Sequence, residues 1–434
     1  MPMKKTLFIA IALLTGITAV AQETPAKFKL YGFMRNYAVI DTREVSGGTH
    51  DLYYYMPKDI LPGTDGSDLN EGLNWKFISL TTRLGLDFSG YEFEGMKVSG
   101  KVEADFYSLN GTSSASTIAQ FRLRQAYMTL SHNLENGDKL FTNIGQTWHP
   151  MGADLPHGIC LESGAPFGPF NRSPQLMINW THGDITLTSG FLYLSQYLPM
   201  DAQTNAKSVA PYKYGWPEEY FGLTWKKGAT VQKLGFTNIM TKPVRTIGGY
   251  KANGLLDALT AFYFFQYTKD MFQLKAKVAY AMSGEHMNIL SGYGIASYDA
   301  TTYTYTYTPM QDLTSFISAQ YGKRFQVLGM IGYMKHLGTT QDLLGGAAVM
   351  GKTVADGGNL WINTAAATNI QQAFRVTPTL VWNMGKLQFG LEYDFTMAQF
   401  GNDGVARNAR GLYSDADCHW IGNHRLLCMT KFNF

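Results

Sequence analysis

The stretch ISLTTRLGLDFSGYEFEGMKVSGKVEADF, residues 78–106, holds two segments with a two-residue periodicity on either side of a glycine-containing turn. In residues 78–88 the even positions carry Ile, Leu, Thr, Leu, Leu and Phe, and the odd positions carry Ser, Thr, Arg, Gly and Asp. In residues 96–106 the even positions are again mostly apolar, and the odd ones carry Lys, Ser, Lys, Glu and Asp. Successive side chains of an extended strand point to opposite faces, so each segment has one apolar and one polar face. The stretch therefore predicts a β-hairpin with two matching faces.

The same alternation recurs along the chain. It is clear in residues 272–282 and 387–397, where helical spacing fails. With the C-terminal segment the total is about sixteen strands, an even number, as single-chain membrane barrels require. The weaker candidates are residues 27–41, 121–130, 139–148, 175–181, 184–194, 220–226, 231–241, 256–267, 312–321, 325–334 and 374–383.

Composition and strand length separate two all-β architectures. A soluble β-sandwich or propeller also alternates, but its strands are typically about 5 to 6 residues long, shorter than these segments. Charged residues make up only 16% of the chain and aromatic residues 14%, against about 25% charged residues in a typical soluble domain. Beyond residue 21 no apolar stretch reaches the roughly 20 residues of a spanning helix. The sequence therefore predicts a transmembrane antiparallel up-and-down β-barrel.

The N-terminus predicts export. Lys4 and Lys5 precede an apolar run over residues 7–20, and Ala19 and Ala21 form an A-x-A cleavage pattern. A single membrane anchor is the alternative, but the run is short and interrupted by Thr and Gly. We expect residues 1–21 to be a signal peptide and residues 22–434 one barrel domain in the outer membrane of a Gram-negative bacterium.

The connections and the C-terminus agree with a barrel. Short connections at residues 89–95 and 384–386 alternate with long ones at 44–76, 150–174, 195–217, 284–311 and 338–371, as expected for periplasmic turns and extracellular loops. The last segment alternates and ends on the aromatic Phe434, which resembles the terminal signature of outer-membrane barrels. Trp148, Trp225 and Trp382 lie near strand ends, where interfacial aromatic girdles form.

Residues 145–174, GQTWHPMGADLPHGICLESGAPFGPFNRSP, form the most distinctive connection. They are rich in Gly and Pro, yet too apolar in places for a mobile external loop. One hypothesis is that this segment folds into the lumen as a plug or constriction. An ordinary external loop or a subunit contact is the alternative.

Three short stretches resemble a known family. KLYGFMRNYAVIDTRE (residues 29–44), FRLRQAYMTL (121–130) followed by IGQTWHP (144–150), and the terminal KFNF look like the DcaP-like outer-membrane porins. The resemblance implies a sixteen-stranded barrel, usually trimeric, that admits small and often anionic organic solutes. Some family members carry an N-terminal periplasmic coiled coil, for which residues 22–26 leave no room.

Alternation also assigns charges to the polar face of the strands. Arg122 and Arg124, two residues apart on one face, are the best candidates for a carboxylate-binding ladder. An excess of fixed positive charge in a narrow channel favours anions. The alternative is that these cations neutralise acidic side chains on neighbouring strands. The predicted pore-lining or solute-binding residues are Arg83, Lys97, Lys101, Glu103, Asp105, Arg122, Arg124, Lys275, Lys277, Arg375, Glu392, Asp394 and Arg425, with Asp87 and Lys431 on the same face.

We therefore expect a porin that works without a cofactor or resident metal and is not an enzyme. The alternatives are a gated or hydrophobic-substrate transporter, a surface receptor, or an outer-membrane lipid hydrolase, whose Ser–His pair only geometry reveals. The expected partners are outer-membrane lipid and lipopolysaccharide, small solutes and two further copies in a homotrimer. A net charge of +3 without a basic run argues against nucleic acid.

Two motif-like clusters are interpreted as non-functional. GAAVMGKT, residues 346–353, matches a phosphate-binding loop but lacks the strand and helix that such a loop needs. His149, His157 and Cys160 with His419 fit no usual zinc spacing, so we interpret the histidines as solvated loop residues. Three cysteines, Cys160, Cys418 and Cys428, allow at most one disulfide.

Overall fold

The computed structural model describes residues 26–48, 50–107, 119–204, 206–345, 360–362 and 369–434. The predicted signal peptide, residues 1–21, and the stretch that matches a phosphate-binding loop, residues 346–353, lie outside the described residues. Among the described residues no helix is long and apolar enough to span a membrane.

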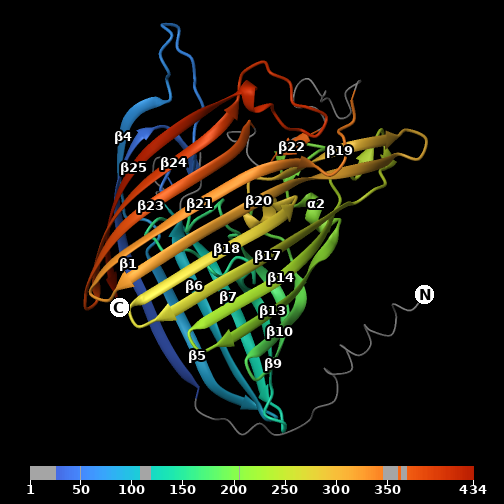
Figure 1. Ribbon diagram of the computed structural model, residues 1–434. Helices are drawn as coiled ribbons and strands as arrows, with labels where there is room; N and C mark the ends of the chain where they lie inside the picture. Colours follow the sequence, from blue (N-terminus) through green and yellow to red (C-terminus); the bar gives the residue numbers. More distant parts are fainter. Residues whose placement is uncertain (1–25, 49, 108–118, 205, 346–359, 363–368) are drawn as a thin grey trace.

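The described strands close into a sixteen-stranded antiparallel barrel, as predicted. Strand β1 pairs with β25 on one side and with β4 and β5 on the other, so the sheet has no free edge there. Figure 1 shows steeply tilted strands, with the long connections at one end of the barrel and the short turns at the other. The barrel strands are β1 (Lys27–Arg43), β4 (Glu71–Ile78) with β5 (Arg83–Phe93), β6 (Met96–Tyr107), β7 (Gln120–Asn133), β8 (Lys139–Trp148), β9 (Arg172–His182), β10 (Ile185–Leu192), β13 (Trp216–Lys227), β14 (Thr230–Thr241), β17 (Leu256–Lys269), β18 (Phe272–Met282), β20 (Thr304–Gly322), β21 (Phe325–Thr339), β23 (Ile370–Met384), β24 (Leu387–Gly401) and β25 (Cys418–Asn433).

Small elements lie within the long connections between the barrel strands. They are β2 (Val45–Gly48), β3 (Tyr53–Pro57), β11 (Met200–Asp201), β12 (Ala206–Lys207), α2 (Ala210–Lys213), β15 (Thr246–Ile247), β16 (Tyr250–Lys251), β19 (Gly292–Asp299), β22 (Leu360–Ile362) and 3₁₀ turns at Gly284–Met287 and Asp415–Asp417.

Alternation sorts the side chains as predicted. Val102 and Phe106 on β6 are exposed on the outer face, while Glu103 and Asp105 between them are buried in the interior. The same holds on β24, where Leu391 and Tyr393 face out and Glu392 faces in. An outer face of this composition suits hydrocarbon, and the polar groups lie inside.

One predicted strand is wrong in detail. Residues 78–88 are not a single strand, because β4 ends at Ile78 and β5 begins at Arg83. Trp75 and Phe77 on β4 face out at odd positions, whereas Leu84 on β5 faces out at an even one. The break between them inserts one extra residue, and Thr81 there has a left-handed φ of 66°. Apolar and polar residues continue to alternate through the break. The switch of the outward positions from odd to even therefore cannot be inferred from the sequence.

The C-terminal strand closes the barrel at its last residue. The Phe434 amide donates to the Gly32 carbonyl oxygen at 3.1 Å. A Cβ at Gly32 would lie 2.4 Å from the Arg83 carbonyl oxygen and 2.6 Å from the Phe434 ring. Glycine is therefore required at this position by close approach of the closing strands.

Candidate functional site

The segment of residues 150–171, here called the lumen loop, folds inside the barrel. Its backbone is bound by side chains that point inward from four different strands. Since these strands lie around the barrel circumference, the loop crosses the lumen, as the plug hypothesis expected, and it is not an ordinary external loop. The bonds run from Tyr37 Oη to the Ile159 carbonyl (2.7 Å), from Lys275 Nζ to the Leu155 carbonyl (2.9 Å), from Lys277 Nζ to the Met151 carbonyl (2.8 Å), from the His157 amide to Ser318 Oγ (2.8 Å) and from the Ile159 amide to Glu392 Oε2 (2.8 Å).

Glycines on the wall make room for this loop. A Cβ at Gly332 on β21 would lie 2.5 Å from the Phe167 ring, and a Cβ at Gly390 on β24 would lie 2.8 Å from Ile159 Cδ1. Both glycines occupy inward positions of their strands. Phe167 itself is fully buried, so the loop packs against the wall by close apolar contact as well as by hydrogen bonds.

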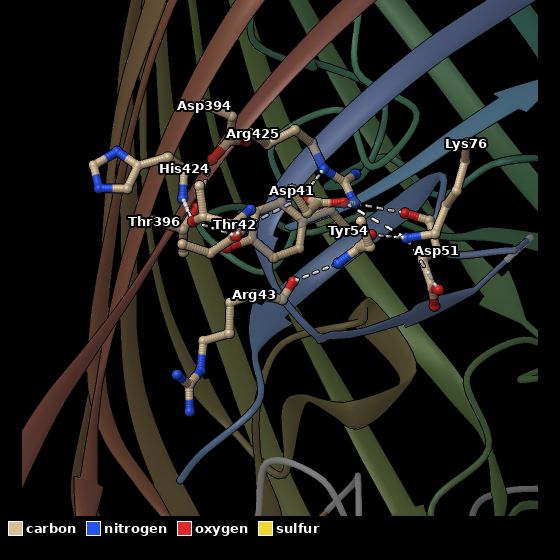
Figure 2. A network of polar contacts seen from close by, with 12 residues as sticks. Asp41, Thr42, Arg43, Asp51, Tyr54, Lys76, Asp394, Thr396, His424 and Arg425 are labelled. Carbon is tan, nitrogen blue, oxygen red and sulfur yellow. Dashed lines mark hydrogen bonds and ion pairs between the residues drawn. The ribbon is translucent and has the colours of Figure 1, made fainter. Parts of the chain in front are cut away.

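A second segment, the hairpin of β2 and β3, also enters the lumen. Arg425 on β25 forms an ion pair with Asp41 on β1, with its Nε and Nη2 donating at 2.8 and 2.9 Å. The same guanidinium donates to the carbonyls of Asp51 and Leu52 at the hairpin tip, at 2.7 and 3.3 Å. Figure 2 shows Arg425 pointing at both Asp41 and Asp51, with Tyr54 below. No pattern of residues within the predicted loop 44–76 indicates this inward hairpin.

Arg375 on β23 joins the wall to both inserted segments. It lies 3.2 Å from Asp394 on β24 and 3.5 Å from Glu162 of the lumen loop. It also donates to the carbonyls of Tyr55 and Ala165, at 2.9 and 3.2 Å. Burial raises the pKa of the Glu162 carboxyl, and the Arg375 charge acts against that rise. The guanidinium therefore holds buried acceptors from two loops in one place.

A cavity of about 220 Å³ remains between the lumen loop and the strands β1 and β5 to β8. Four arginines, Arg35, Arg83, Arg122 and Arg124, line it. Arg83, Arg122 and Arg124 are predicted site residues. The structure therefore places the two arginines of the proposed carboxylate-binding ladder, Arg122 and Arg124, on a cavity wall. The remaining lining residues are Tyr53, Tyr107, Trp148, Leu155, Cys160, Leu161, Ser163, Phe170 and Tyr197.

Two carboxylates stand behind these arginines. Asp105 lies 2.8 Å from Arg122 and 2.6 Å from Arg124. Glu103 lies 3.0 Å from Arg124 and 3.4 Å from Arg83. Cross-strand neutralisation, the alternative raised from the sequence, therefore operates here. Four guanidinium groups against two carboxylates still leave an excess of positive charge.

Arg35 contributes much of that excess, and sequence reasoning missed it. Its Nε and Nη2 donate to the Thr81 hydroxyl at 3.0 and 2.7 Å. No carboxylate among the described residues forms an ion pair with it. The odd positions of β1 face inward, so the weaker alternation of residues 27–41 was the signal that identifies Arg35.

Arg172 is the second missed cation. It is 1% exposed, and its guanidinium lies 4.6 Å from the Trp148 ring and 5.5 Å from the Phe170 ring. Within the described part of the chain its Nε and Nη1 have no hydrogen-bond partner. The predicted strand began at residue 175, so Arg172 was assigned to the loop instead of to the start of β9.

The other predicted residues divide into two groups. Lys275, Lys277, Arg375, Glu392, Asp394 and Arg425 hold the inserted segments as described above, and all but Lys275 are at most 3% exposed. Nearer the short turns, Lys101 pairs with Asp87 at 3.2 Å, Lys97 is exposed, and Lys431 lies 4.5 Å from the Phe33 ring. A solute-binding role for any of them stays a prediction.

The interpretation of the histidines as solvated is wrong for His149, which directly precedes the lumen loop, and His157 within the loop is half-buried. His149 is fully buried, and its Nε2 lies 3.0 Å from Glu218 Oε1 on β13. Its Nδ1 accepts the Met151 amide at 3.1 Å, which fixes the start of the loop. His286 lies 3.3 Å from the same carboxylate. Burial lowers the pKa of both His149 and His157.

Across the described ranges no group of three His, Cys, Asp or Glu side chains has a geometry that would hold a metal ion. All three cysteines are free.

Comparison with known proteins confirms the predicted resemblance at the level of the fold. The outer membrane channel DcaP of Acinetobacter baumannii superposes with a TM-score of 0.61 over 96% of this chain and 100% of that one, at 16% identity. Salmonella typhi OmpF, in a complex with daunomycin, gives 0.51 at 10% identity, covering 94% and 98%. OmpT, an outer membrane protein of Vibrio cholerae, gives 0.50 at 8% identity, covering 96% and 100%. No protein-family model and no curated protein sequence matches the chain.

Proposed function

We propose that this chain is an outer-membrane porin whose channel passes small solutes and prefers anions. The barrel is porin-like in strand number and in its resemblance to outer-membrane channels. The observation that carries the anion preference is the arginine-lined cavity beside the lumen loop. There Arg35, Arg83, Arg122 and Arg124 outnumber Glu103 and Asp105, the carboxylates that pair with these arginines among the described residues.

The physical argument rests on confinement. Fixed charges on the wall of a narrow, low-dielectric channel raise the local concentration of ions of opposite sign. Guanidinium groups also donate two parallel hydrogen bonds to carboxylates and phosphates. Some of these donors in Arg122 and Arg124 already bind carboxylates. We therefore assign the anion preference mainly to Arg35 and to the excess of guanidinium groups over carboxylates around the cavity.

The reversal potential across a planar bilayer tests this proposal. In a KCl gradient the wild-type channel is expected to show a potential of the sign that chloride permeation produces. The Arg35→Gln substitution should move the reversal potential toward zero. It leaves no described carboxylate without an ion-pair partner, because Arg35 pairs with none of them. Lys323→Gln, in the exposed turn between β20 and β21, is the matched control and should change nothing. A cation-selective potential in the wild type would contradict the anion preference.

The same recording separates the alternatives. A gated or hydrophobic-substrate transporter, or a receptor, would give a silent bilayer. Among the similar structures, DcaP carries a name that states a role, that of an outer membrane channel, which supports the porin over a lipid hydrolase.

Export, location and assembly complete the proposal. We assign residues 1–21 to a signal peptide, the mature chain to the outer membrane, and its assembly to a homotrimer. Cell fractionation with N-terminal sequencing of the mature protein tests the first two. Cross-linking of the folded protein in detergent tests the third, and a species that stays monomeric would contradict it.

A further inference from the structure

The lumen side of β14 and β18 carries three lysines, here called the lysine cluster. Lys233 on β14 is the cross-strand partner of Phe264 on β17, and Phe264 is the partner of Lys277 on β18. The two Nζ atoms lie 5.7 and 5.5 Å from the Phe264 ring. Lys275 lies two residues before Lys277, on the same face of β18. This part of the wall is separate from the arginine-lined cavity, which lies against β1 and β5 to β8.

Asp154 of the lumen loop supplies a carboxylate to the lysine cluster. Its two oxygens accept from Lys233 Nζ at 2.8 and 2.9 Å. Among the described residues, Lys275 and Lys277 have no carboxylate at ion-pair distance. Three ammonium groups therefore face one carboxylate, and the cluster keeps an excess of positive charge.

The ammonium groups of Lys275 and Lys277 have hydrogen-bond donors to spare. In the described part of the chain each donates to one carbonyl of the lumen loop, although an ammonium group has three donors. Lys277 is 3% exposed, and a buried charge is normally paired. Lys233 and Lys275 are only partly buried. The cluster is therefore open to solvent on one side and lacks counter-charge on the other.

We propose that the lysine cluster is a binding site for a doubly charged oxyanion, and that Asp154 is a tethered competitor for this site. Lysine binds phosphate-like anions as a point charge, without the fixed geometry that a guanidinium group imposes. A doubly charged anion balances three cations better than a single carboxylate does. Asp154 has the advantage of its tether, because a short linker gives an effective concentration in the millimolar range.

Exchange of Asp154 for a free anion also affects the lumen loop. Asp154 precedes Leu155, whose carbonyl accepts from Lys275 and whose residue lines the arginine-lined cavity. An anion that displaces the carboxylate therefore releases the start of the loop beside that cavity. This inference deepens the proposed function and rests on it for the entry of anions into the lumen. The binding site itself does not depend on ion flow.

Binding of inorganic phosphate to the folded protein in detergent tests the lysine cluster. The measurement is isothermal titration at about pH 8, where phosphate is mostly doubly charged. Asp154→Asn should lower the dissociation constant for phosphate at least about tenfold, because the tethered carboxylate is gone. Adding Lys233→Gln and Lys275→Gln to that variant should abolish the gain. Asp184→Asn, in the exposed turn between β9 and β10, is the matched control and should bind like the wild type.

Three results contradict the proposal. A dissociation constant unchanged by Asp154→Asn would show that this carboxylate does not compete for the site. A gain that survives both lysine substitutions, or that is lost with Arg35→Gln, would place the anion in the arginine-lined cavity. An equal affinity for acetate would remove the preference for a double charge.

Two further measurements keep the test separate from folding and from conduction. β-sheet circular dichroism checks that each variant folds. Asp154→Ala removes the same charge and carries the same prediction if the Asn variant does not fold. Phosphate binding together with a silent bilayer would contradict the porin proposal and leave the lysine cluster standing, whereas an anion-selective current with unchanged phosphate binding in the Asp154 variants would contradict the lysine cluster alone.

Discussion

Arg375 couples the barrel wall to the contents of the lumen through a single side chain. It is fully buried, and it binds Asp394 on the neighbouring strand, Glu162 on the lumen loop and the Tyr55 carbonyl on the inserted hairpin. Breaking a buried charge pair from one side is costly, because the remaining charge stays without a partner.

Replacing Arg375 with Gln is expected to release both inserted segments. Glu162 and Asp394 lose their shared cation, and the free energy of unfolding should fall by about 3–5 kcal/mol. The single-channel conductance should rise, because the lumen loop and the hairpin lose a common anchor. Arg324→Gln, at an exposed turn, serves as the control. A conductance equal to that of the wild type would show that the segments do not depend on this anchor.

The fully buried His149 and the half-buried His157 are expected to make the lumen loop sensitive to acid. Burial, aided by the charge of Lys275, lowers the pKa of His157 from the ordinary 6.5 to about 4, and burial lowers that of His149. A histidine with a lowered pKa binds fewer protons in the folded than in the unfolded state. The stability of the loop is therefore complete above pH 6.5 and falls as the pH decreases from 6.5 toward 4.

Conductance recorded between pH 7 and pH 4 tests this sensitivity. We expect larger and noisier currents below pH 6 as the loop loosens. His157→Gln keeps the amide bond to Ser318 and removes the titrating ring, so it should flatten part of the response. His132→Gln, an exposed histidine at the short-turn end, should leave it intact. A response that is unchanged in the His157 variant would assign the titration to other groups.

At the scale of elements, alternation predicts a strand well wherever one face meets lipid and the other meets the lumen. The predicted bounds of β8 and β18 are those of the structure. Prediction fails where lipid no longer constrains one face. Strand β20 begins at Thr304, eight residues before the predicted start, in an extension where Thr and Tyr alternate without a lipid-facing side. The extra residue between β4 and β5 was not predicted, because apolar and polar residues continue to alternate through the break.

Removing residues 153–165 from the lumen loop tests its role as an element. This deletion takes away Ile159, Glu162 and the contacts to Lys275 and Ser318, and we expect a severalfold larger single-channel conductance with weaker anion preference. Because the hairpin of β2 and β3 still occupies the lumen, opening should be partial. A conductance that matches the wild type would mean that the loop does not limit ion flow.

At the scale of the whole molecule, the closed barrel was predictable from the sequence, whereas the charged site in its lumen was predictable only in part. The strand number, the antiparallel order and the closure of β1 on β25 follow from the periodicity and the need to pair every edge in lipid. The site was predictable only in part. Arg83, Arg122 and Arg124 line the cavity as their strand positions indicated, but the loops that bury Lys277, Arg375 and Arg425 fold by contacts between residues far apart in sequence. No local pattern encodes these contacts.

Liposome swelling with matched neutral, anionic and cationic solutes of equal size tests the central claim most directly. A sixteen-stranded barrel with an arginine-lined cavity beside the lumen loop should admit the anionic solute faster than the neutral one, and the cationic solute slowest. With the Arg35→Gln variant, the difference in swelling rate between the anionic and the cationic solute should be smaller. If the liposomes swell equally with all three solutes, or fastest with the cation, the lumen charge does not select the solute, and if they do not swell at all, the barrel is not an open channel.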